Sequence, residues 1–295
     1  MVLSRKRESM ISPYTESILI FIGINTILAY SFYIPMTTNQ ISGGQGAFMG
    51  IGAYFSAAMT VNYHLPFPVA LIASGLLSGF VGVLVGFPAL RIRGLYLVIM
   101  TLGFAEVVRV FFLTSEYFGA AYGFSKIQEL TTMTNVAVVL GLIIFVVYRL
   151  ERSYLGRALE AIKENDLAAE TLGVNITKLK VLMFGFGAMV AGLGGALYAH
   201  YALFIDSNNF GFHRSIEMVI FAIFGGVTSI WGPPIGAAIL TVFPEVLRFI
   251  QEWRMVFYGL LMILMMTFRP QGLVTKHMFK DVLSRRGRQE VGDPA

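Results

Sequence analysis

Long apolar runs separated by short polar intervals dominate the chain. Residues 17–90 contain no Asp, Glu, Lys or Arg. About 20 apolar residues are enough for one helix to cross a bilayer, so this run has room for more than one span. Apolar runs predict spans over residues 17–34, 67–90, 94–113, 132–148, 181–201, 218–230, 235–249 and 255–268. The pattern predicts an all-α polytopic membrane protein.

The composition agrees with this prediction and excludes several other classes of protein. Of the 295 residues, 56% are hydrophobic and only 13% are charged, against about 25% charged in an ordinary soluble domain. The mean hydropathy is +0.70. The chain has no Cys and four scattered His, so we expect no disulfide, no metal site and no cofactor. The net charge of +5 indicates membrane topology and not nucleic-acid binding.

A polar, glycine-rich interval interrupts the apolar pattern at residues 37–54. It contains seven hydrogen-bonding side chains and five glycines. Unpaired backbone is costly in lipid, so an interrupted helix here must be buried in protein or line a watery cavity. One interpretation is a translocation pathway, and the other is close helix packing through Gly46 and Gly50. The residues assigned to the pathway are Asn39, Ser42, Gly43, Gly44 and Gln45.

Two opposite charges lie inside the predicted span 94–113. Glu106 and Arg109 are three residues apart and therefore share a helix face. Charges inside a membrane are expensive, and they are usually paired or face a polar interior. The pair has two interpretations, a structural ion pair or a lining of the translocation pathway.

The long polar interval 151–180 is rich in helix formers and carries ten charged residues. It predicts two short helices, from about 153 to 163 with Ser153 as N-cap, and from about 165 to 172 with Asn165 or Asp166 as cap. Gly173 stands where the chain leaves the second helix with positive φ. The predicted apolar underside comprises Leu159, Ile162, Leu167 and Leu172.

Small residues in this interval favour contact with another protein. Ala168, Ala169 and Gly173 would let a partner surface approach the backbone closely. The alternative interpretation is an ordinary loop helix that faces solvent.

The distribution of Lys and Arg predicts which intervals share a side of the membrane. Placing the N-terminal tail 1–16, Arg91 and Arg93, the interval 149–180 and everything from Arg269 onward in the cytoplasm assigns 17 of the 22 basic residues to that side. Both termini inside require an even number of crossings, whereas nine apolar segments are present. We therefore predict about eight full spans, with residues 46–62 as a re-entrant or broken segment. The division is a tail 1–16, a transmembrane domain 17–274 and a basic cytoplasmic tail 275–295.

Two prolines divide the apolar stretch near the C-terminus. Pro233 and Pro234 must interrupt a helix that runs through them. The segments 218–230 and 235–249 are each short for a span, so a re-entrant hairpin hinged at residues 231–234 is one interpretation.

No residue cluster in the chain matches a catalytic motif. The sequence lacks G-x-x-x-x-G-K-[ST], H-E-x-x-H and G-x-S-x-G. We therefore expect a protein that is not itself an enzyme.

Several motifs in order resemble one family. These are QISGGQGAFMGIGAY, LRIRGLYLVIMTLGFAEVVRVFF, SYLGRALEAIKENDLAAETLGVN, GGALYAH, GVTSIWGPPIGAAIL and YGLLMILMMTFRPQGLV. Together they resemble the LivM-type permeases of bacterial ABC importers for branched-chain amino acids and related solutes, over residues 40–274.

The resemblance implies partners, a location and a role for the interval 151–180. It implies a multi-pass permease in the bacterial inner membrane that works with a LivH-like permease, two cytoplasmic ATPases and a periplasmic binding protein. The interval would hold the coupling helix that docks in a cleft of the ATPase. The residues so implicated are Gly156, Arg157, Ala161, Glu164, Ala168, Ala169 and Gly173.

Departures from the family pattern leave the solute open. Leu167 stands where many importer loops carry an acidic residue, and Asn39 and Gln45 stand where relatives often carry Gly and His. Urea or amides are alternative solutes. Outside the family, a secondary transporter would more typically repeat ionisable residues near the midplane of both halves. A membrane-embedded enzyme would need convergent catalytic groups, which the sequence does not show.

Overall fold

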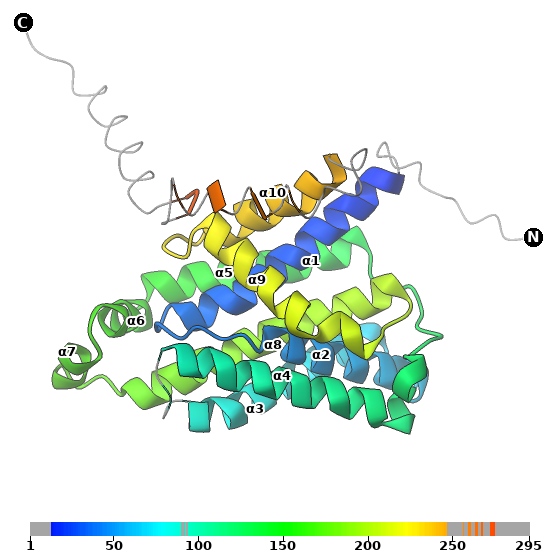
Figure 1. The fold of residues 1–295 in the computed structure, drawn as a ribbon, viewed down its shortest axis with the longest axis horizontal. Coiled ribbons are helices and arrows are strands. Elements are labelled where there is room, and N and C mark those ends of the chain that lie inside the picture. The colour runs from blue at the N-terminus through cyan, green and yellow to red at the C-terminus, as the bar shows by residue number, and fades with distance from the viewer. Residues whose placement is uncertain are drawn as a thin grey trace, which may run out of the picture.

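The computed structural model describes residues 13–89, 92, 94–246, 256, 259–260, 263–264, 267 and 272–274, and this part of the chain is helical apart from its connections (Figure 1). The α-helices are α1 Pro13–Met36, α2 Gln45–Val61, α3 Phe67–Ala89, α4 Leu95–Thr114, α5 Met133–Arg152, α6 Tyr154–Glu164, α7 Asp166–Thr171, α8 Ile176–Ala202, α9 Phe212–Gly225 and α10 Gly232–Val246. Short 3-10 turns are η1 Glu116–Phe118, η2 Ala120–Tyr122 and η3 Ser207–Phe210. The predicted segment 255–268 lies largely outside the described residues, as do the two tails apart from Pro13–Glu16.

Five of the described helices are long and apolar enough to cross a membrane. They are α1, α3, α4, α5 and α8. The prediction of a polytopic helical membrane protein is therefore confirmed. The number of eight spans and the cytoplasmic location of residues 151–180 stay predictions.

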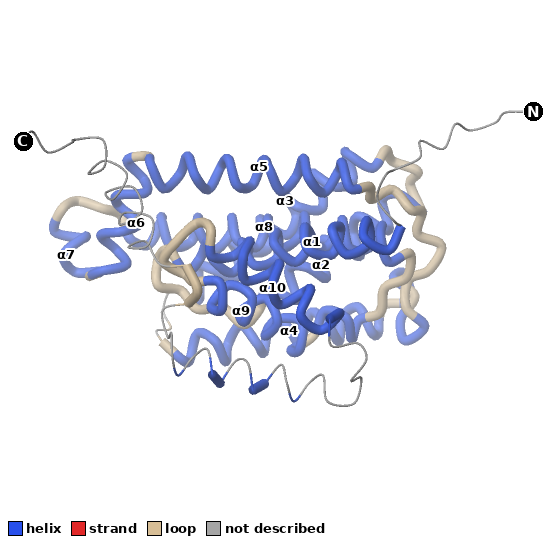
Figure 2. Tube along the Cα trace, turned by 90° about the horizontal axis from the view of Figure 1, so that it is seen from above, coloured by secondary structure: helices blue, strands red, loops and turns tan. Residues whose placement is uncertain are grey.

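Helix α8 lies at the centre of the bundle, against α1, α2 and α3. In Figure 2, α4 and α5 lie on opposite sides of this core. The backbones of α2 and α8 come into direct contact, because a Cβ on Gly195 would overlap the Met49 carbonyl and one on Gly52 would overlap the Gly192 backbone. Small residues allow this approach between membrane helices. Packing through glycine was predicted for α2, but Gly52 makes the contact with α8, while Gly50 packs on the ring of Phe210.

The bundle has two ends, which we name by their loops. The loop end carries α6 and α7, and the far end carries the connections 62–66 and 115–132 (Figure 1). The last turn of α1 reaches the loop end, where the Tyr33 hydroxyl donates a hydrogen bond to Glu151 of α5. Its first turn lies at the far end, where the Tyr14 hydroxyl donates to Glu245 of α10.

This direction of α1 bears on the predicted topology. Pro13–Glu16 lie at the end of the bundle opposite α6 and α7, whereas the basic residues predicted one side for both; the side of the membrane on which each end lies stays a prediction. Helix α2 starts inside the bundle and runs to the far end, where Thr60 lies 3.5 Å from the ring of His200 near the end of α8. Residues 46–62 therefore do not return to the end from which they came. The re-entrant alternative, which was chosen to balance the number of crossings, therefore disagrees with the structure, whereas the broken alternative agrees with it.

Helices α9 and α10 form an antiparallel hairpin whose turn is residues 226–231. A hairpin was one interpretation of this stretch, and its hinge lies at residues 226–231, just before the two prolines, which belong to the first turn of α10. Proline is favoured there because the first turn needs no backbone N–H donor. The segment 272–274 closes the hairpin, because Leu273 and Val274 donate backbone hydrogen bonds of 3.0 and 2.9 Å to Phe224 and Gly225.

Candidate functional site

The first break in the helical pattern enters the bundle between α1 and α2. After α1 the chain turns at Asn39, which is exposed and has a φ of 60°. It then runs inward until the Gly43 N–H donates to Thr101 Oγ1 of α4 at 2.9 Å. The Ser42 hydroxyl accepts a hydrogen bond from the Gly44 N–H at 3.2 Å, and α2 begins at Gln45. The predicted interruption is confirmed, and from Ser42 to Gln45 it is buried in protein.

A second break of the same kind follows α8. Residues 203–211 leave the far end and turn back inward through η3, and α9 begins at Phe212. The two breaks meet, because the Gly46 N–H of α2 donates to Ser215 Oγ of α9 at 3.0 Å. In the sequence, this stretch has the composition of a polar loop, with His200, Asp206, His213, Arg214 and Glu217. Its one signal was the run Asp206–Asn209 between two apolar segments.

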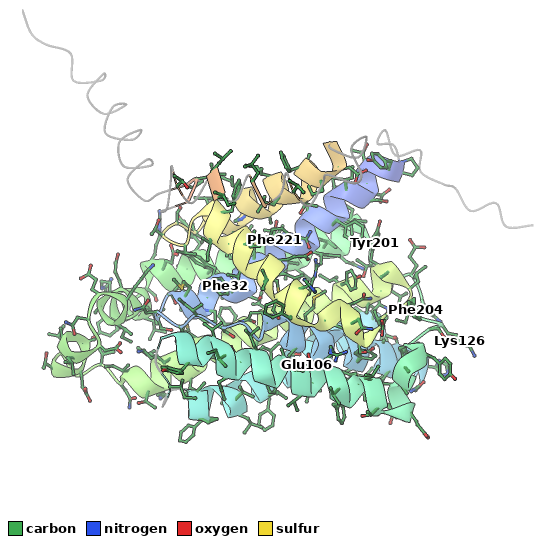
Figure 3. The ribbon with its side chains drawn as sticks, viewed as in Figure 1. Phe32, Glu106, Lys126, Tyr201, Phe204 and Phe221 are labelled. Atoms are coloured by element: carbon green, nitrogen blue, oxygen red, sulfur yellow. The ribbon has the colours of Figure 1, made fainter. Side chains whose placement is uncertain are left out.

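Glu106 and Arg109 form the expected ion pair, which extends further than expected. Arg109 Nε donates to Glu106 Oε1 at 2.9 Å, and Arg109 Nη1 donates to Asn208 Oδ1 at 3.0 Å. Asn208 Nδ2 in turn donates to Asp206 Oδ2 at 2.9 Å. The side chain of Glu106 is 54% exposed and that of Arg109 is 25% exposed. Glu106 lies on α4, as Figure 3 shows, and we call its exposed face the outer face of α4. The network therefore ties α4 to the second break.

A second, part-buried polar network connects α1 with α9 and α10. Arg214 of α9 donates to Glu217 at 2.7 Å and to Asn25 Oδ1 of α1 at 2.9 Å. Asn25 Nδ2 then donates to Thr241 of α10 at 2.9 Å. This second network fixes the α9–α10 hairpin to α1.

The two helices of the interval 151–180 form as predicted. Ser153 Oγ accepts the Gly156 N–H at 3.3 Å, and Asn165 Oδ1 accepts the N–H groups of Leu167 and Ala168. Gly173 leaves α7 with a φ of 80°. These contacts are the N-caps and the C-terminal glycine expected from the residue types.

The exposure of this loop differs from the predicted underside. Leu159 and Ile162 of α6 are buried, but Leu167 and Leu172 are 72% and 76% exposed. Ala169 is completely buried, whereas Ala168 is exposed. The spacing of small residues had predicted that Ala169 is accessible to a partner. This prediction was wrong because the orientation of the six-residue helix α7 depends on its packing against α8, which the sequence alone does not give. The accessible small and apolar surface is formed by Leu167, Ala168, Leu172 and Gly173.

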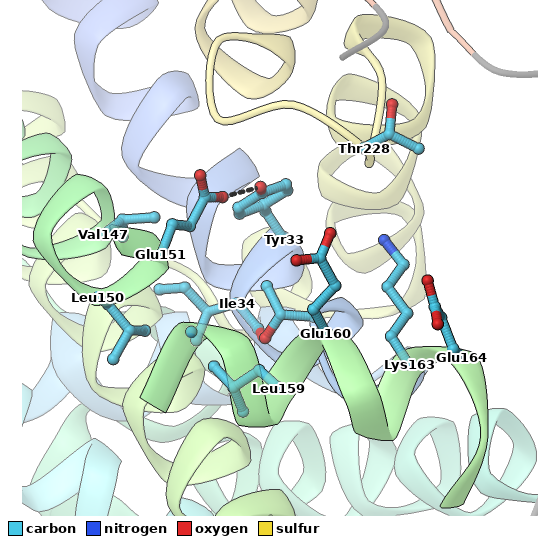
Figure 4. A pocket seen from close by; sticks show the side chains of 12 residues that line it. Tyr33, Ile34, Val147, Leu150, Glu151, Leu159, Glu160, Lys163, Glu164 and Thr228 are labelled. Atoms are coloured by element: carbon cyan, nitrogen blue, oxygen red, sulfur yellow. Dashed lines mark hydrogen bonds between the residues drawn. The ribbon is translucent and has the colours of Figure 1, made fainter. Parts of the chain in front are cut away.

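Helix α6 rests on the ends of α1 and α5 around a cavity of about 290 Å³ (Figure 4). Lys163 Nζ donates to the Val227 carbonyl in the α9–α10 turn at 3.3 Å. A Cβ on Gly156 would lie 2.5 Å from the Leu150 carbonyl, so the turn from α5 into α6 requires glycine. Of the other residues assigned to coupling, Arg157 and Glu164 are exposed and Ala161 is half-buried.

Asn39 does not join the rest of its predicted group. It lines a separate polar cavity of about 400 Å³ with Asp166 and Leu167 of α7. Asp166 there accepts a hydrogen bond of 2.7 Å from Lys180. The structure therefore places Asn39 beside the loop 151–180, and Ser42 to Gln45 inside the bundle.

Within the described residues, no group of His, Asp and Glu could hold a metal ion. The bundle contains two helix interruptions, one before α2 and one before α9, which meet in its interior. It also contains the charged side chains of Glu106 and Arg109 within the span α4. Interrupted helices of this kind are typical of solute sites in membrane transporters, where irregular backbone is tolerated only within protein or a cavity. The fold and site therefore define a helical membrane permease.

Comparison with known proteins gives the family. The chain belongs to the family described as branched-chain amino acid transport system / permease component, which matches residues 14–266. It is 33% identical to the high-affinity branched-chain amino acid transport system permease protein LivM of Salmonella typhimurium, over 94% of this chain and 72% of that protein.

Two further relatives are LivM of another organism and a permease named for a different solute. LivM of Escherichia coli K12 is also 33% identical, over 87% of this chain and 67% of that protein. The autoinducer 2 import system permease protein LsrC of Escherichia coli is 25% identical, over 82% of this chain and 75% of that protein. No solved structure matches the chain. Family membership makes the chain a permease component and not an enzyme.

Proposed function

We propose that the chain is the membrane permease subunit of an ABC importer for branched-chain or other hydrophobic amino acids. The observation that carries this proposal is the 33% identity to two LivM permeases over most of the chain. The relative named for autoinducer 2 import is less similar, at 25% identity. Another small solute, such as urea or an amide, is the alternative.

Import of this kind needs partners that the chain itself lacks. ATP hydrolysis would occur in cytoplasmic ATPase subunits, solute capture in a periplasmic binding protein, and a LivH-like permease would complete the pathway. The exposed residues on the outer face of α4 are an argument for a protein partner on that face. This face exposes the carboxylate of Glu106 beside apolar residues, and a charge facing lipid is expensive. A partner permease or the aqueous pathway on this face would remove that cost.

The function is tested with the complete importer in proteoliposomes. We expect uptake of leucine, isoleucine or valine that requires the binding protein, ATP and the ATPase subunits. Uptake of urea or amides in their place would support the alternative solute. Uptake by this chain without any ATPase would contradict the importer assignment.

The exposed part of α6 and α7 is the proposed docking surface for the ATPase. Ala168→Arg would insert a long charged chain between Leu167 and Leu172, while arginine remains a good helix former. We expect normal membrane insertion with at least about tenfold less ATPase recovered on co-purification, because interfaces lose affinity when a small packed residue is enlarged. Lys178→Ala, at an exposed position of α8, is the control. Normal ATPase recovery together with normal uptake in Ala168→Arg would contradict the docking surface.

The two ends of the bundle predict the sidedness of single cysteines. Because the natural chain has no cysteine, each engineered thiol reports alone. With α6 and α7 in the cytoplasm, Lys163→Cys should react only from inside. Thr15→Cys and Lys126→Cys, at the far end, should react only from outside (Figure 3). Labelling of Thr15→Cys and Lys163→Cys from the same side would contradict this orientation.

A further inference from the structure

The two interrupted helices meet by their N-termini inside the bundle. Gly46, in the first turn of α2, is held to Ser215, in the first turn of α9, and a Cβ on Gly46 would be 2.8 Å from the Phe210 carbonyl. Neither helix has a side-chain hydrogen bond at its N-cap, which is Gly44 for α2 and Gly211 for α9. Each helix N-terminus carries about half a positive charge from the aligned peptide dipoles. Two partial positive charges close together in a buried position favour the binding of an anion.

The first side chain of α2 is polar, fully buried and without a partner. Gln45 is 0% exposed, and neither its Oε1 nor its Nε2 has a hydrogen-bond partner in the structure. Leaving a buried polar group unpaired costs about 1–3 kcal/mol, so an amide with both atoms unpaired needs an explanation. Gln40, in the same break, shows the usual arrangement, because its Oε1 accepts a hydrogen bond of 3.1 Å from Thr38. Gln45 therefore has unused hydrogen-bonding capacity in the first turn of α2, next in sequence to Gly46, which contacts α9.

The charged side chains around this junction are engaged in contacts with one another or with Asn208. The side chains that hold it together, Ser42, Thr101 and Ser215, are neutral hydroxyls. Arg109 lies beside the second helix end, where a Cβ on Gly211 would be 3.4 Å from its Cδ. The acidic groups of the described neighbourhood, Glu106 and Asp206, are bonded to Arg109 and Asn208 respectively.

We propose that the N-termini of α2 and α9, with Gln45, form a binding site for the carboxylate of the transported solute. This inference rests on the proposed function, because it states which part of an amino acid the permease holds. The carboxylate accepts from Gln45 Nε2 and from backbone N–H groups of the two helix ends other than those already bonded to Ser215, Gly44 and Gly211. In the structure the site is closed, since the Thr101–Gly43 hydrogen bond holds α4 against the first break. Opening of the pathway separates α4 from this break and admits the solute.

A pair of glutamine variants tests the site in the complete importer. Gln45→Met keeps the length of the side chain and removes its unpaired amide. We expect uptake to fall at least about tenfold, the loss typical of one hydrogen bond to a charged group, while the melting temperature stays the same or rises. Gln40→Met is the control, because it removes an amide that is bonded to Thr38. It should lower the melting temperature while uptake per folded complex is retained.

The result distinguishes a binding role from a structural one. Normal uptake by Gln45→Met would overturn the site, and so would a lower melting temperature with uptake reduced only in proportion to the folded protein. The wild-type importer is measured in parallel. If it transports no amino acid, the proposed function fails, whereas a wild-type importer that transports leucine beside an unaffected Gln45→Met variant refutes the site alone.

A single cysteine identifies the chemistry of the ligand. Ser42→Cys should react during ATP turnover faster with an anionic methanethiosulfonate than with a cationic one. Leucine should slow this reaction, and leucinol, which has no carboxylate, should not. A preference for the cationic reagent, or equal protection by leucinol, would overturn the carboxylate assignment. Protection by chloride or sulfate in place of leucine would show a site for a free inorganic anion and would overturn it as well.

Discussion

Replacing Gly195 by alanine should abolish most of the folded protein. The added Cβ would overlap the Met49 carbonyl of α2, and the obstacle is backbone, which cannot move aside as a flexible side chain can. Overpacking a well-packed core costs about 1–3 kcal/mol, and a backbone clash between two central helices lies at or beyond the upper limit. Fluorescence-detected size-exclusion chromatography of the detergent-solubilised protein measures the monodisperse fraction.

The control is the same substitution where the structure leaves room. Gly141 lies on the outer side of α5, and a Cβ there would have nothing within 4 Å. Gly141→Ala should therefore retain a normal monodisperse peak, since alanine is the better helix former. Equal yields of the two variants would show that α2 and α8 are not packed backbone to backbone.

The sequence predicted those elements that depend on local rules. Apolar runs of sufficient length predicted the five long helices to within a few residues, because the thickness of a bilayer leaves little freedom in helix length. The caps of α6 and α7 followed from Ser153 and Asn165, whose side chains satisfy the first backbone donors of a helix. The interruption before Gln45 followed from its glycines and polar side chains.

The features that were missed depend on contacts distant in sequence. The direction of α1 is fixed by contacts of Tyr33 with Glu151 and of Tyr14 with Glu245, more than a hundred residues away in each case. The second break, before Phe212, has the composition of any polar loop, and only its contact with Gly46 shows that it enters the bundle. The burial of Ala169 likewise depends on how α7 folds back, which no spacing within six residues encodes.

The sequence predicted that Glu106 and Arg109 pair their opposite charges. It did not predict that the two side chains differ in their hydrogen-bond partners and in their exposure. Arg109 contacts both Glu106 and Asn208, whereas the hydrogen bonds that the structure shows for the Glu106 carboxylate both come from Arg109. Glu106 is also the more exposed of the two on the outer face of α4. The two single substitutions should therefore have unequal effects, although from the sequence they look equivalent.

Arg109→Gln should reduce the folded yield far more than Glu106→Gln. Removing the arginine leaves a carboxylate without its cation inside a membrane span, at a cost of about 3 kcal/mol, whereas removing the glutamate leaves Arg109 bonded to Asn208. In the double variant no charge is left alone, so its yield should recover most of the loss. Folded yield in membranes is compared with Glu116→Gln, a charge removal in the loop after α4.

Uptake per folded complex then separates a structural pair from a pathway lining. If the pair only stabilises the bundle, the double variant regains uptake in step with its yield, because nothing that contacts the solute has changed. If Glu106 and Arg109 line the pathway, the double variant folds but transports less for each molecule in the membrane. Equal yields for both single variants and the wild type would contradict an energetic role for the pair, and would indicate that water already solvates Glu106 on the outer face of α4.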